Sequence, residues 1–339
     1  MKIAYIIYPE VIISNKSNGI RSQAISWANS LNKYYNTEVV FVNNWDDYNW
    51  TEFDIIHLFG GGGTWVEIIT SRLSKINNNI VFSPIIDPIP TKNINIERFK
   101  VLLPQITHNI LKTQEGIIAN QFKYIKKILV RSQYEANYIN QVYGVPQNKM
   151  DYVPLSFTPQ YELETEKVTK EHFCFHISSL YQERKNVLRL VKAAKKYNFE
   201  LYLAGNKGTE EQFQKLQKEI ATSSNIHVLG YISEKEKISL YKKAKVFALP
   251  SLQEGVGIVA VDAALMGCEI VISNIGGPKE YYNKKACIVN PYNIDDIGKN
   301  IVSLMNNEVN FQPDLSKHIK DNYSPKRISE LLLKTYQTI

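Results

Sequence analysis

The chain has 339 residues, of which 44% are hydrophobic and 22% are charged, and this balance argues against an intrinsically disordered protein. The formal net charge of +7 is spread along the sequence. It comes without a recognition motif, so we expect no nucleic-acid partner, although a mild basic surplus suits phosphorylated ligands or an anionic membrane surface. No apolar stretch is long enough to span a bilayer, and the first residues show no cleavable signal pattern. We therefore expect a cytoplasmic protein that could contact the inner face of a membrane peripherally.

In the first part of the chain, short β-branched runs alternate with longer helical patterns. The expected strands are 3–8, 39–42, 55–59, 80–82, 128–130 and 152–153. Helical patterns between them include 20–31, 65–76 and 133–143. Strands this short and apolar, separated by helices, predict a parallel sheet covered on both faces.

The same rhythm returns in the second part of the chain. The expected strands are 173–177, 201–204, 227–229, 246–249, 270–273 and 288–289. The helical patterns include 186–197, 210–220, 234–243 and 259–266, and a last helix begins at the Ser-Pro pair 324–325. A second parallel α/β sheet is therefore predicted.

The break between the two parts falls at 154–171, where two prolines and the charged stretch ELETEKVTKE replace any clear strand. These patterns predict an α/β protein with two Rossmann-like, doubly wound parallel-sheet domains, at 1–155 and 156–322. Ligands of open α/β sheets bind beyond the carboxyl ends of the strands, so we expect the two domains to face each other across a cleft that holds the best pocket.

The most informative segment is PSLQEGVGIVAVDAALMGCEIVIS, residues 250–273. A strand leads into a Pro-Ser turn, a loop with two glycines, and a helix that contains Asp262. The loop residues are Glu254, Gly255, Val256 and Gly257. Small residues at a helix start let the backbone approach a ligand, and the free N–H groups there attract anions. One carboxylate can then reach sugar hydroxyls and the other a ribose; the alternative is an acidic helix start followed by an ordinary solvated carboxylate.

This segment resembles the E-x7-E signature of the family 4 retaining glycosyltransferases. Three further segments are similar to that family in the same order: SSLYQERKNVLRLVKAA (178–194), NIHVLGYISEKEKISLYKKAKVFALPS (225–251) and NIGGPKEYY (274–282). The resemblance covers 173–305 and implies a GT-B fold. It further implies that 1–155 is the acceptor domain, that 156–322 is the nucleotide-sugar donor domain, and that a helix in 323–339 packs back on the first domain.

The resemblance assigns the two catalytic positions to Glu254 and Lys185. Glu254 is implied to hold the transferred sugar, and Lys185 to hold the donor phosphates; a fixed cation stabilises the charge that develops on the leaving nucleotide. For Lys185 the alternative is a solvated lysine at a helix start. Where the family has a partner arginine this chain has Ser179, and Arg184 is the candidate replacement because its planar fork can grip a phosphate in two places.

The remaining donor positions are implied less directly. Asp262 stands where the family has a glutamate and is expected to meet the ribose. Tyr231 is expected beside the base through its backbone, with a core tyrosine as the alternative. Gly19 falls where the family has a glycine-rich loop, and the Gly276-Gly277 pair is expected to shape a turn beside the diphosphate.

For the acceptor side the candidates are Asp87, His57 and His108. Asp87 is the retained half of a His-Asp pair that the family often has, while Ile86 stands where the histidine would be. For the two histidines of this chain, a purely structural role is the alternative.

The resemblance thus implies a retaining, metal-independent enzyme that moves a hexose or N-acetylhexosamine from a nucleotide-diphosphate sugar to a surface-glycan or cell-envelope acceptor, including a glycolipid. The nucleotide sugar is a substrate, and we expect no cofactor and no metal, because the adjacent pairs Asp46-Asp47 and Asp295-Asp296 do not form a DxD clamp at a strand end. Two alternatives stay open. One is a catalytically reduced GT-B partner or binding subunit, which Ser179 and Ile86 motivate, and the other is a sugar-nucleotide epimerase.

Overall fold

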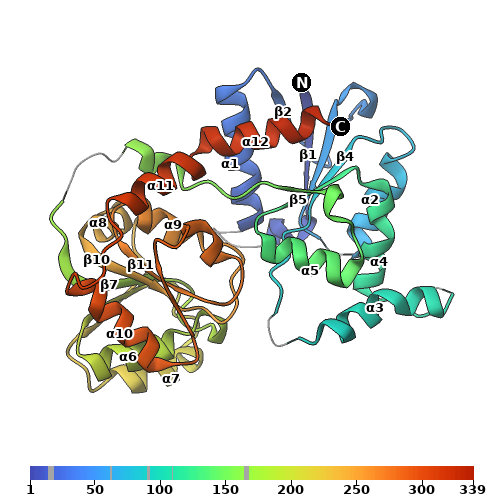
Figure 1. Ribbon diagram of the computed structural model, residues 1–339. Coiled ribbons are helices and arrows are strands. Elements are labelled where there is room, and N and C mark those ends of the chain that lie inside the picture. Colours follow the sequence, from blue (N-terminus) through green and yellow to red (C-terminus); the bar gives the residue numbers. More distant parts are fainter. Residues whose placement is uncertain (14–18, 62, 90–91, 109, 164–167) are drawn as a thin grey trace. The chain divides into compact units, whose positions relative to one another are not determined.

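A computed structural model describes residues 1–339 except 14–18, 62, 90–91, 109 and 164–167. The chain forms two compact units, one made of Met1–Leu155 with Pro325–Ile339 and the other of Ser156–Ser324 (Figure 1). Each unit contains a six-stranded parallel sheet with flanking helices, which confirms two Rossmann-like α/β units. Every predicted strand overlaps a strand of the structure.

The sheet of the N-terminal unit has the strand order β2-β1-β3-β4-β5-β6. Its strands are β1 (Lys2–Ile7), β2 (Glu38–Phe41), β3 (Ile55–Phe59), β4 (Ile80–Ser83), β5 (Lys127–Val130) and β6 (Met150–Tyr152). β3 is buried along its whole length, as expected for a central strand covered on both faces.

The N-terminal unit has helices that we predicted and two that we did not. Its helices before the last one are α1 (Gly19–Tyr34), α2 (Gly63–Leu73), α3 (Ile94–Ile106), α4 (Gln114–Gln121) and α5 (Gln133–Tyr143). Its short 3-10 turns are η1 (Pro9–Ile13), η2 (Trp50–Glu52), η3 (Phe122–Tyr124) and η4 (Gln147–Lys149). The unpredicted helices are α3, which contains Pro104, and α4, whose first turn is capped by the side chain of Thr113. A proline inside a helix and an eight-residue helix both weaken the periodic pattern from which helices are predicted.

The last helix, α12 (Pro325–Gln337), belongs to the N-terminal unit and packs against α1, which it crosses (Figure 1). Its Tyr336 reaches the sheet, where the hydroxyl hydrogen-bonds to Nδ1 of His57 at 2.6 Å and to the hydroxyl of Tyr5 at 3.0 Å. All three side chains are buried, so these polar contacts fix the helix on the sheet.

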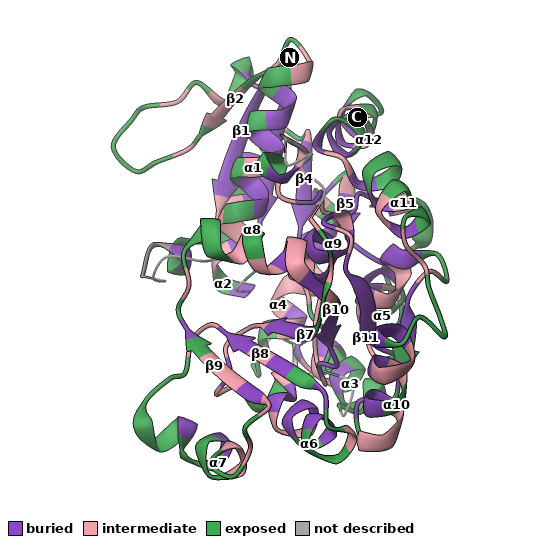
Figure 2. Ribbon diagram, turned by 90° about the vertical axis from the view of Figure 1, so that its left-hand side faces the viewer, coloured by how far each residue is buried: buried purple, intermediate pink, exposed green. Residues whose placement is uncertain are grey.

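The sheet of the C-terminal unit has the strand order β12-β11-β10-β7-β8-β9. Its strands are β7 (Glu171–Ile177), β8 (Glu200–Ala204), β9 (Ile226–Gly230), β10 (Ala244–Leu249), β11 (Glu269–Ser273) and β12 (Cys287–Val289). Its helices are α6 (Val187–Tyr197), α7 (Glu210–Ile220), α8 (Glu234–Lys243), α9 (Ile258–Leu265), α10 (Ile294–Met305) and α11 (Asp314–Tyr323), with turns η5 (Pro159–Leu163), η6 (Glu183–Lys185) and η7 (Pro278–Tyr282). Figure 2 shows β7, β10 and β11 as the buried centre of this sheet.

The strand order of the C-terminal unit reverses between β7 and β10. From β7 the chain proceeds outward to β8 and β9, whereas from β10 it proceeds the other way to β11 and β12. The connections that follow β7 and β10 therefore leave toward opposite faces of the sheet, and open α/β sheets bind ligands at such a point, beyond the carboxyl ends of the two strands. We name this region between the two connections the crevice. No helix among the described residues is long and apolar enough to cross a membrane.

Candidate active site

Two charged side chains meet at the crevice of the C-terminal unit. Lys185 ends η6, in the connection that follows β7, and Glu254 lies in the loop that follows β10. The Lys185 ammonium forms an ion pair with Oε2 of Glu254, and the two side chains are only 13% and 14% exposed. The structure therefore brings together the two residues for which we predicted catalytic roles, in a largely desolvated position where charges interact strongly.

The backbone around this pair is tied together as well. The N–H of Leu252 donates to the carbonyl of Arg184 at 2.8 Å, which links the loop after β10 to the turn before Lys185. The hydroxyl of Ser251 lies 3.4 Å from Oε2 of Glu254. The side chain of Arg184 itself is exposed, so this second predicted phosphate ligand lies at the rim of the crevice.

Asn186, which the sequence did not single out, anchors the turn that carries Lys185. It is 3% exposed and has a left-handed backbone, with φ of 59°. Its amide donates to the carbonyls of Pro250 at 2.9 Å and Pro291 at 2.7 Å, and its Oδ1 accepts from Arg189 at 2.8 Å. One side chain thus fastens the loops after β10 and β12 to the start of α6. The local signal was an asparagine at a helix start, but its two carbonyl partners are far away in sequence.

His176, also missed from sequence, joins β7 to β10 beside the pair. It is fully buried; Nδ1 lies 2.7 Å from the carbonyl of Ala248 and Nε2 lies 2.7 Å from the hydroxyl of Ser178. A carbonyl can only accept, so Nδ1 carries the proton and Nε2 accepts from the serine. Burial lowers the pKa of His176 to about 4, and the nearby charge of Lys185 acts in the same direction. The imidazole is therefore neutral at pH 7 and serves as a rigid spacer between the strands.

Two glycines shape the loop of Glu254. Gly257 precedes α9 with φ of +68°, and a Cβ there would lie 2.8 Å from Cδ2 of Leu249. Gly276 has φ of +85°, and a Cβ there would lie 2.8 Å from the carbonyl oxygen of Glu254. A side chain at Gly276 would thus collide with backbone, so the turn before η7 can pack against Glu254 only because this residue is glycine. Val256 is buried in the same loop, and Gly255 is partly exposed.

Asp262 makes a contact that the sequence did not predict. We expected it to meet a ribose, but its side chain is 2% exposed and both of its carboxylate oxygens are occupied. The N–H of Thr158 donates to Oδ1 at 2.7 Å, and its hydroxyl donates to Oδ2 at 2.6 Å. Burial raises the pKa of Asp262 to about 6, although these two hydrogen bonds oppose the shift. In this structure Asp262 anchors the first segment of the C-terminal unit to α9.

Two predicted donor residues remain, Tyr231 in the C-terminal unit and Gly19 in the N-terminal unit. Tyr231 follows β9 with 79% of its surface exposed, so the alternative of a core tyrosine is wrong. Gly19 is the first residue of α1 in the N-terminal unit, and a Cβ there would meet no atom within 4 Å. No close backbone approach in the structure therefore requires a glycine at this position. The residues just before it, 14–18, lie outside the described part of the chain.

The three residues suggested for the acceptor side do not form one site. His57 is fully buried in β3 between Tyr336 and the hydroxyl of Ser83, which lies 2.9 Å from Nε2, and burial lowers its pKa well below the ordinary value. Its role as an acceptor ligand is therefore wrong, and the structural alternative holds. His108 is exposed just beyond the end of α3.

Asp87 occupies the loop after β4 and is held by one cation. It forms an ion pair with Arg131 at 2.8 Å, and Arg131 also binds the buried carboxylate of Glu135 at 3.0 Å. The same arginine donates to the carbonyl of Ile86 at 2.9 Å. Asp87 thus shares a rigid charged cluster that shapes its loop.

The N-terminal unit contains a concave region of its own, which we name the aromatic groove. It has a volume of about 760 Å³ and lies between the carboxyl ends of β1 and β2, the 43–50 loop and α2. The 42–54 connection contains only the short turn η2 where a crossover helix would ordinarily cover the sheet. Its rings come from Tyr8, Phe41, Tyr48, Trp50 and Trp65, and its polar side chains from Arg21, Asn43, Asp46, Asp47 and Arg72.

The loop of the aromatic groove is internally braced. Oδ1 of Asn43 accepts from the N–H groups of Trp45 at 2.7 Å and Asp46 at 3.1 Å, while the Asn43 amide donates to Asp46 at 2.6 Å. The hydroxyl of Tyr48 donates to the same carboxylate at 3.3 Å. This network holds Trp45, which also lines the groove, 94% exposed at the surface.

The C-terminal unit is similar in sequence to known glycosyltransferases. The family model described as Glycosyl transferases group 1 matches residues 159–323, which is nearly all of the C-terminal unit. O-antigen chain mannosyltransferase B from Escherichia coli is 24% identical over 200 residues, which cover 54% of this chain and 52% of that protein. The chain thus matches about half the length of this curated relative.

Solved structures show the same fold over the whole chain. A crystal structure of Anabaena Alr3699/HepE in complex with UDP has a TM-score of 0.73 at 14% identity and covers 100% of both chains. Sucrose-phosphate synthase from Thermosynechococcus elongatus has a TM-score of 0.74 at 12% identity, with 99% of this chain and 98% of that chain covered. These matches confirm the predicted resemblance to glycosyltransferases of the GT-B fold.

Proposed function

We propose that this protein is a retaining, metal-independent glycosyltransferase that moves a hexose or N-acetylhexosamine from a nucleotide-diphosphate sugar to a surface-glycan or cell-envelope acceptor. The observation that carries the proposal is the Lys185–Glu254 ion pair in the crevice between β7 and β10. The two charges lie where an α/β sheet binds its ligands. A nucleotide-sugar donor has a diphosphate, which a cation can bind, and a sugar, whose hydroxyls a carboxylate can bind.

In this proposal the ion pair is exchanged when the donor binds. The diphosphate competes with Glu254 for the Lys185 ammonium, which then stabilises the charge on the leaving nucleotide. Glu254, released from the lysine, accepts hydrogen bonds from hydroxyls of the transferred sugar. Arg184 at the rim supplies a second positive charge, so neutralisation does not depend on a metal ion. The departing phosphate takes the proton of the acceptor hydroxyl, and the enzyme then needs no separate base.

The named relatives support the substrate classes. The Escherichia coli protein is a mannosyltransferase of an O-antigen chain, which supports a hexose and a surface polysaccharide. The Anabaena protein was solved in complex with UDP-glucose as well as with UDP, which supports a nucleotide sugar as donor.

For the acceptor we propose the aromatic groove. The faces of aromatic rings stack on the apolar faces of sugar rings, and amide, carboxylate and guanidinium groups bind the hydroxyls at their edges. The groove combines rings such as Trp45 and Trp65 with Asn43, Asp46 and Arg72 in one concavity. It is thus suited to a segment of a growing glycan.

The test is sugar transfer with purified protein. A thermal-shift screen of nucleotide diphosphates and nucleotide sugars identifies the donor, because a ligand of the native state raises its apparent stability. With that donor, Lys185→Ala and Glu254→Ala should each lower kcat/KM by at least about 100-fold, which corresponds to the loss of one preorganised charge. Lys218→Ala and Glu210→Ala, which remove the same residue types from α7, are the matched controls.

Glu254→Gln separates the two roles of this carboxylate. It removes the anion that competes for Lys185, so we expect tighter binding of the nucleoside diphosphate together with slower transfer. Transfer unaffected by both alanine variants, or nucleotide binding unchanged in Glu254→Gln, would contradict the proposed exchange. Product analysis without acceptor distinguishes an epimerase, and nucleotide binding without turnover in the wild type would indicate a partner subunit.

A further inference from the structure

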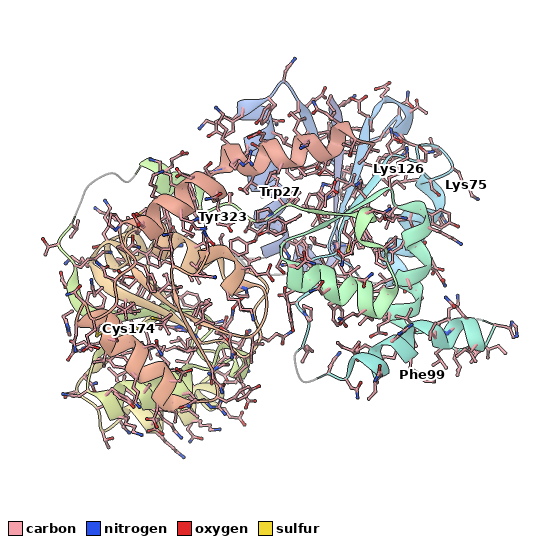
Figure 3. The ribbon with its side chains drawn as sticks, viewed as in Figure 1. Trp27, Lys75, Phe99, Lys126, Cys174 and Tyr323 are labelled. Carbon is pink, nitrogen blue, oxygen red and sulfur yellow. The ribbon has the colours of Figure 1, made fainter. Side chains whose placement is uncertain are left out.

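Helix α3 has an apolar surface on the side that does not pack against the protein. Glu97, Val101 and Pro104 are buried, and they lie on one face of the helix, where α3 packs on α4 and α5. On the opposite face Phe99, which is 55% exposed, Leu102 and Ile106 follow one another at helical spacing. Figure 3 shows Phe99 on the side of α3 away from α4. A helix at a protein surface ordinarily places polar residues there.

The apolar surface extends beyond this stripe. Seven large hydrophobic side chains between 94 and 111 are exposed, and Ile110 is the most exposed of them, at 83%. The seven are Ile94, Ile96, Phe99, Leu102, Ile106, Ile110 and Leu111. Single exposed hydrophobic residues are ordinary, but a contiguous group marks a surface that has a partner.

The charges on this segment are positive. Between 92 and 112 the sequence has four lysines and arginines against a single acid, Glu97. That carboxylate is buried and is bound by Lys100 at 2.8 Å and by Lys92 at 3.8 Å. Arg98 and Lys112 are exposed in the same segment. Cations beside an apolar helix face complement a surface that is anionic outside and apolar beneath, which is the chemistry of an anionic lipid leaflet.

We propose that α3, together with residues 107–108 and 110–112, docks this protein onto an anionic membrane surface. The 13 residues of α3 lie in the plane of the interface, with Phe99, Leu102 and Ile106 entering the boundary between head groups and acyl chains. Arg98 and Lys112 meet the lipid phosphates. A protein partner would be expected to offer carboxylates instead, and the experiment separates the two. The inference does not depend on the proposed transferase activity.

The first test measures binding to vesicles by co-sedimentation. The wild-type protein should bind vesicles of phosphatidylglycerol mixed with phosphatidylcholine, and bind pure phosphatidylcholine much more weakly. The triple variant Phe99→Ser, Leu102→Ser, Ile106→Ser should lower the partition coefficient by at least about tenfold, because three side chains lose their apolar environment. The matched control, Ile25→Ser, Ile288→Ser, Val309→Ser, replaces three exposed hydrophobic residues elsewhere and should bind like the wild type.

A second pair of variants isolates the charges. The double variant Arg98→Gln, Lys112→Gln should lower anionic-vesicle binding by about tenfold or more, since each basic residue near a charged leaflet contributes on the order of 1 kcal/mol. The control Lys299→Gln, Lys320→Gln removes the same net charge at other exposed positions and should retain binding. Thermal unfolding of each variant checks that it is folded.

Two results would overturn the proposal. One is equal binding of the wild type and the α3 serine variant to anionic vesicles. The other is a wild-type protein that does not bind vesicles but self-associates in sedimentation velocity, while the α3 serine variant is monomeric. In that case α3 would be an interface between copies of the chain. Vesicle binding bears on α3 alone, so its failure leaves the proposed transferase activity untouched.

Discussion

Replacing Asn186 probes how the turn of Lys185 is held. Asn186→Gly removes three side-chain hydrogen bonds, to Pro250, Pro291 and Arg189, but keeps a residue that tolerates the left-handed backbone. At about 1 kcal/mol for each hydrogen bond, the free energy of unfolding of the C-terminal unit should fall by about 3 kcal/mol. Asn186→Ala loses the same bonds and adds strain at φ of 59°, so it should cost roughly 1 kcal/mol more.

The distribution of tryptophans allows the two units to be followed separately. All four tryptophans, Trp27, Trp45, Trp50 and Trp65, belong to the N-terminal unit. Tryptophan fluorescence therefore reports that unit during urea unfolding, whereas far-ultraviolet circular dichroism reports both. In Asn186→Gly, the dichroism transition should shift to a lower urea concentration, and the fluorescence transition should shift less.

Asn198 provides the matched control for Asn186. It also has a left-handed backbone, with φ of 51°, but its side chain is exposed at the end of α6. Asn198→Gly should therefore change stability and activity little. Because a displaced cation loses most of its effect on a transition state, Asn186→Gly should lower kcat/KM about 10- to 100-fold. If Asn186→Gly were as stable and as active as Asn198→Gly, the anchoring role assigned to Asn186 would be refuted.

Three further substitutions test other parts of the structure. The pKa of Asp262 is raised from 3.8 to about 6, so between these pH values the unfolded chain has released a proton that the native protein retains. The free energy of unfolding should therefore fall by at most about 3 kcal/mol as the pH rises through this range. Asp262→Asn should abolish this fall in urea titrations. Gly276→Ala should destabilise the protein by at least about 1–2 kcal/mol and slow transfer, since the new Cβ meets the Glu254 carbonyl; wild-type melting and kinetics would refute this. Trp45→Ala should change the free energy of unfolding by less than about 0.5 kcal/mol, because the side chain is exposed. It should raise the KM for the glycan acceptor without altering donor binding, and an unchanged acceptor KM would argue against the aromatic groove as the acceptor site.

The sheets were predictable because their signals are local. Runs such as 246–249 and 270–273 are short, apolar and bounded by turn residues, and each corresponds to a strand buried on both faces. The α3 helix had no such signal. Its exposed face is apolar and its packed face contains the charged residue Glu97, so the alternation of polar and apolar residues that predicts a surface helix is absent.

The site was predictable only as far as its residues are close to a motif. Glu254 and Lys185 follow strands in recognisable loops, and the sequence indicated both. Asn186 and His176 were missed because their hydrogen-bond partners are distant in sequence. The partners of Asn186 lie 64 and 105 residues away, and the backbone partner of His176 lies 72 residues away on a neighbouring strand. Asp262 is the opposite case. Its place in the motif predicted a ligand contact, but in the structure its carboxylate accepts hydrogen bonds from the backbone N–H and the hydroxyl of Thr158.

These observations connect the topology to the chemistry. Strand reversal between β7 and β10 places two loops side by side, and His176 and Asn186 then fix their spacing through buried hydrogen bonds. The lysine and the carboxylate shield each other from solvent, and their side chains are only 13% and 14% exposed. Breaking such a desolvated pair is costly unless both charges receive new partners at once. A molecule with an anionic group and a hydroxyl-bearing ring joined at one bond supplies both partners together, whereas free phosphate or a free sugar supplies only one. Under the proposed function, we therefore expect the pair to bind an intact nucleotide sugar in preference to either of its halves.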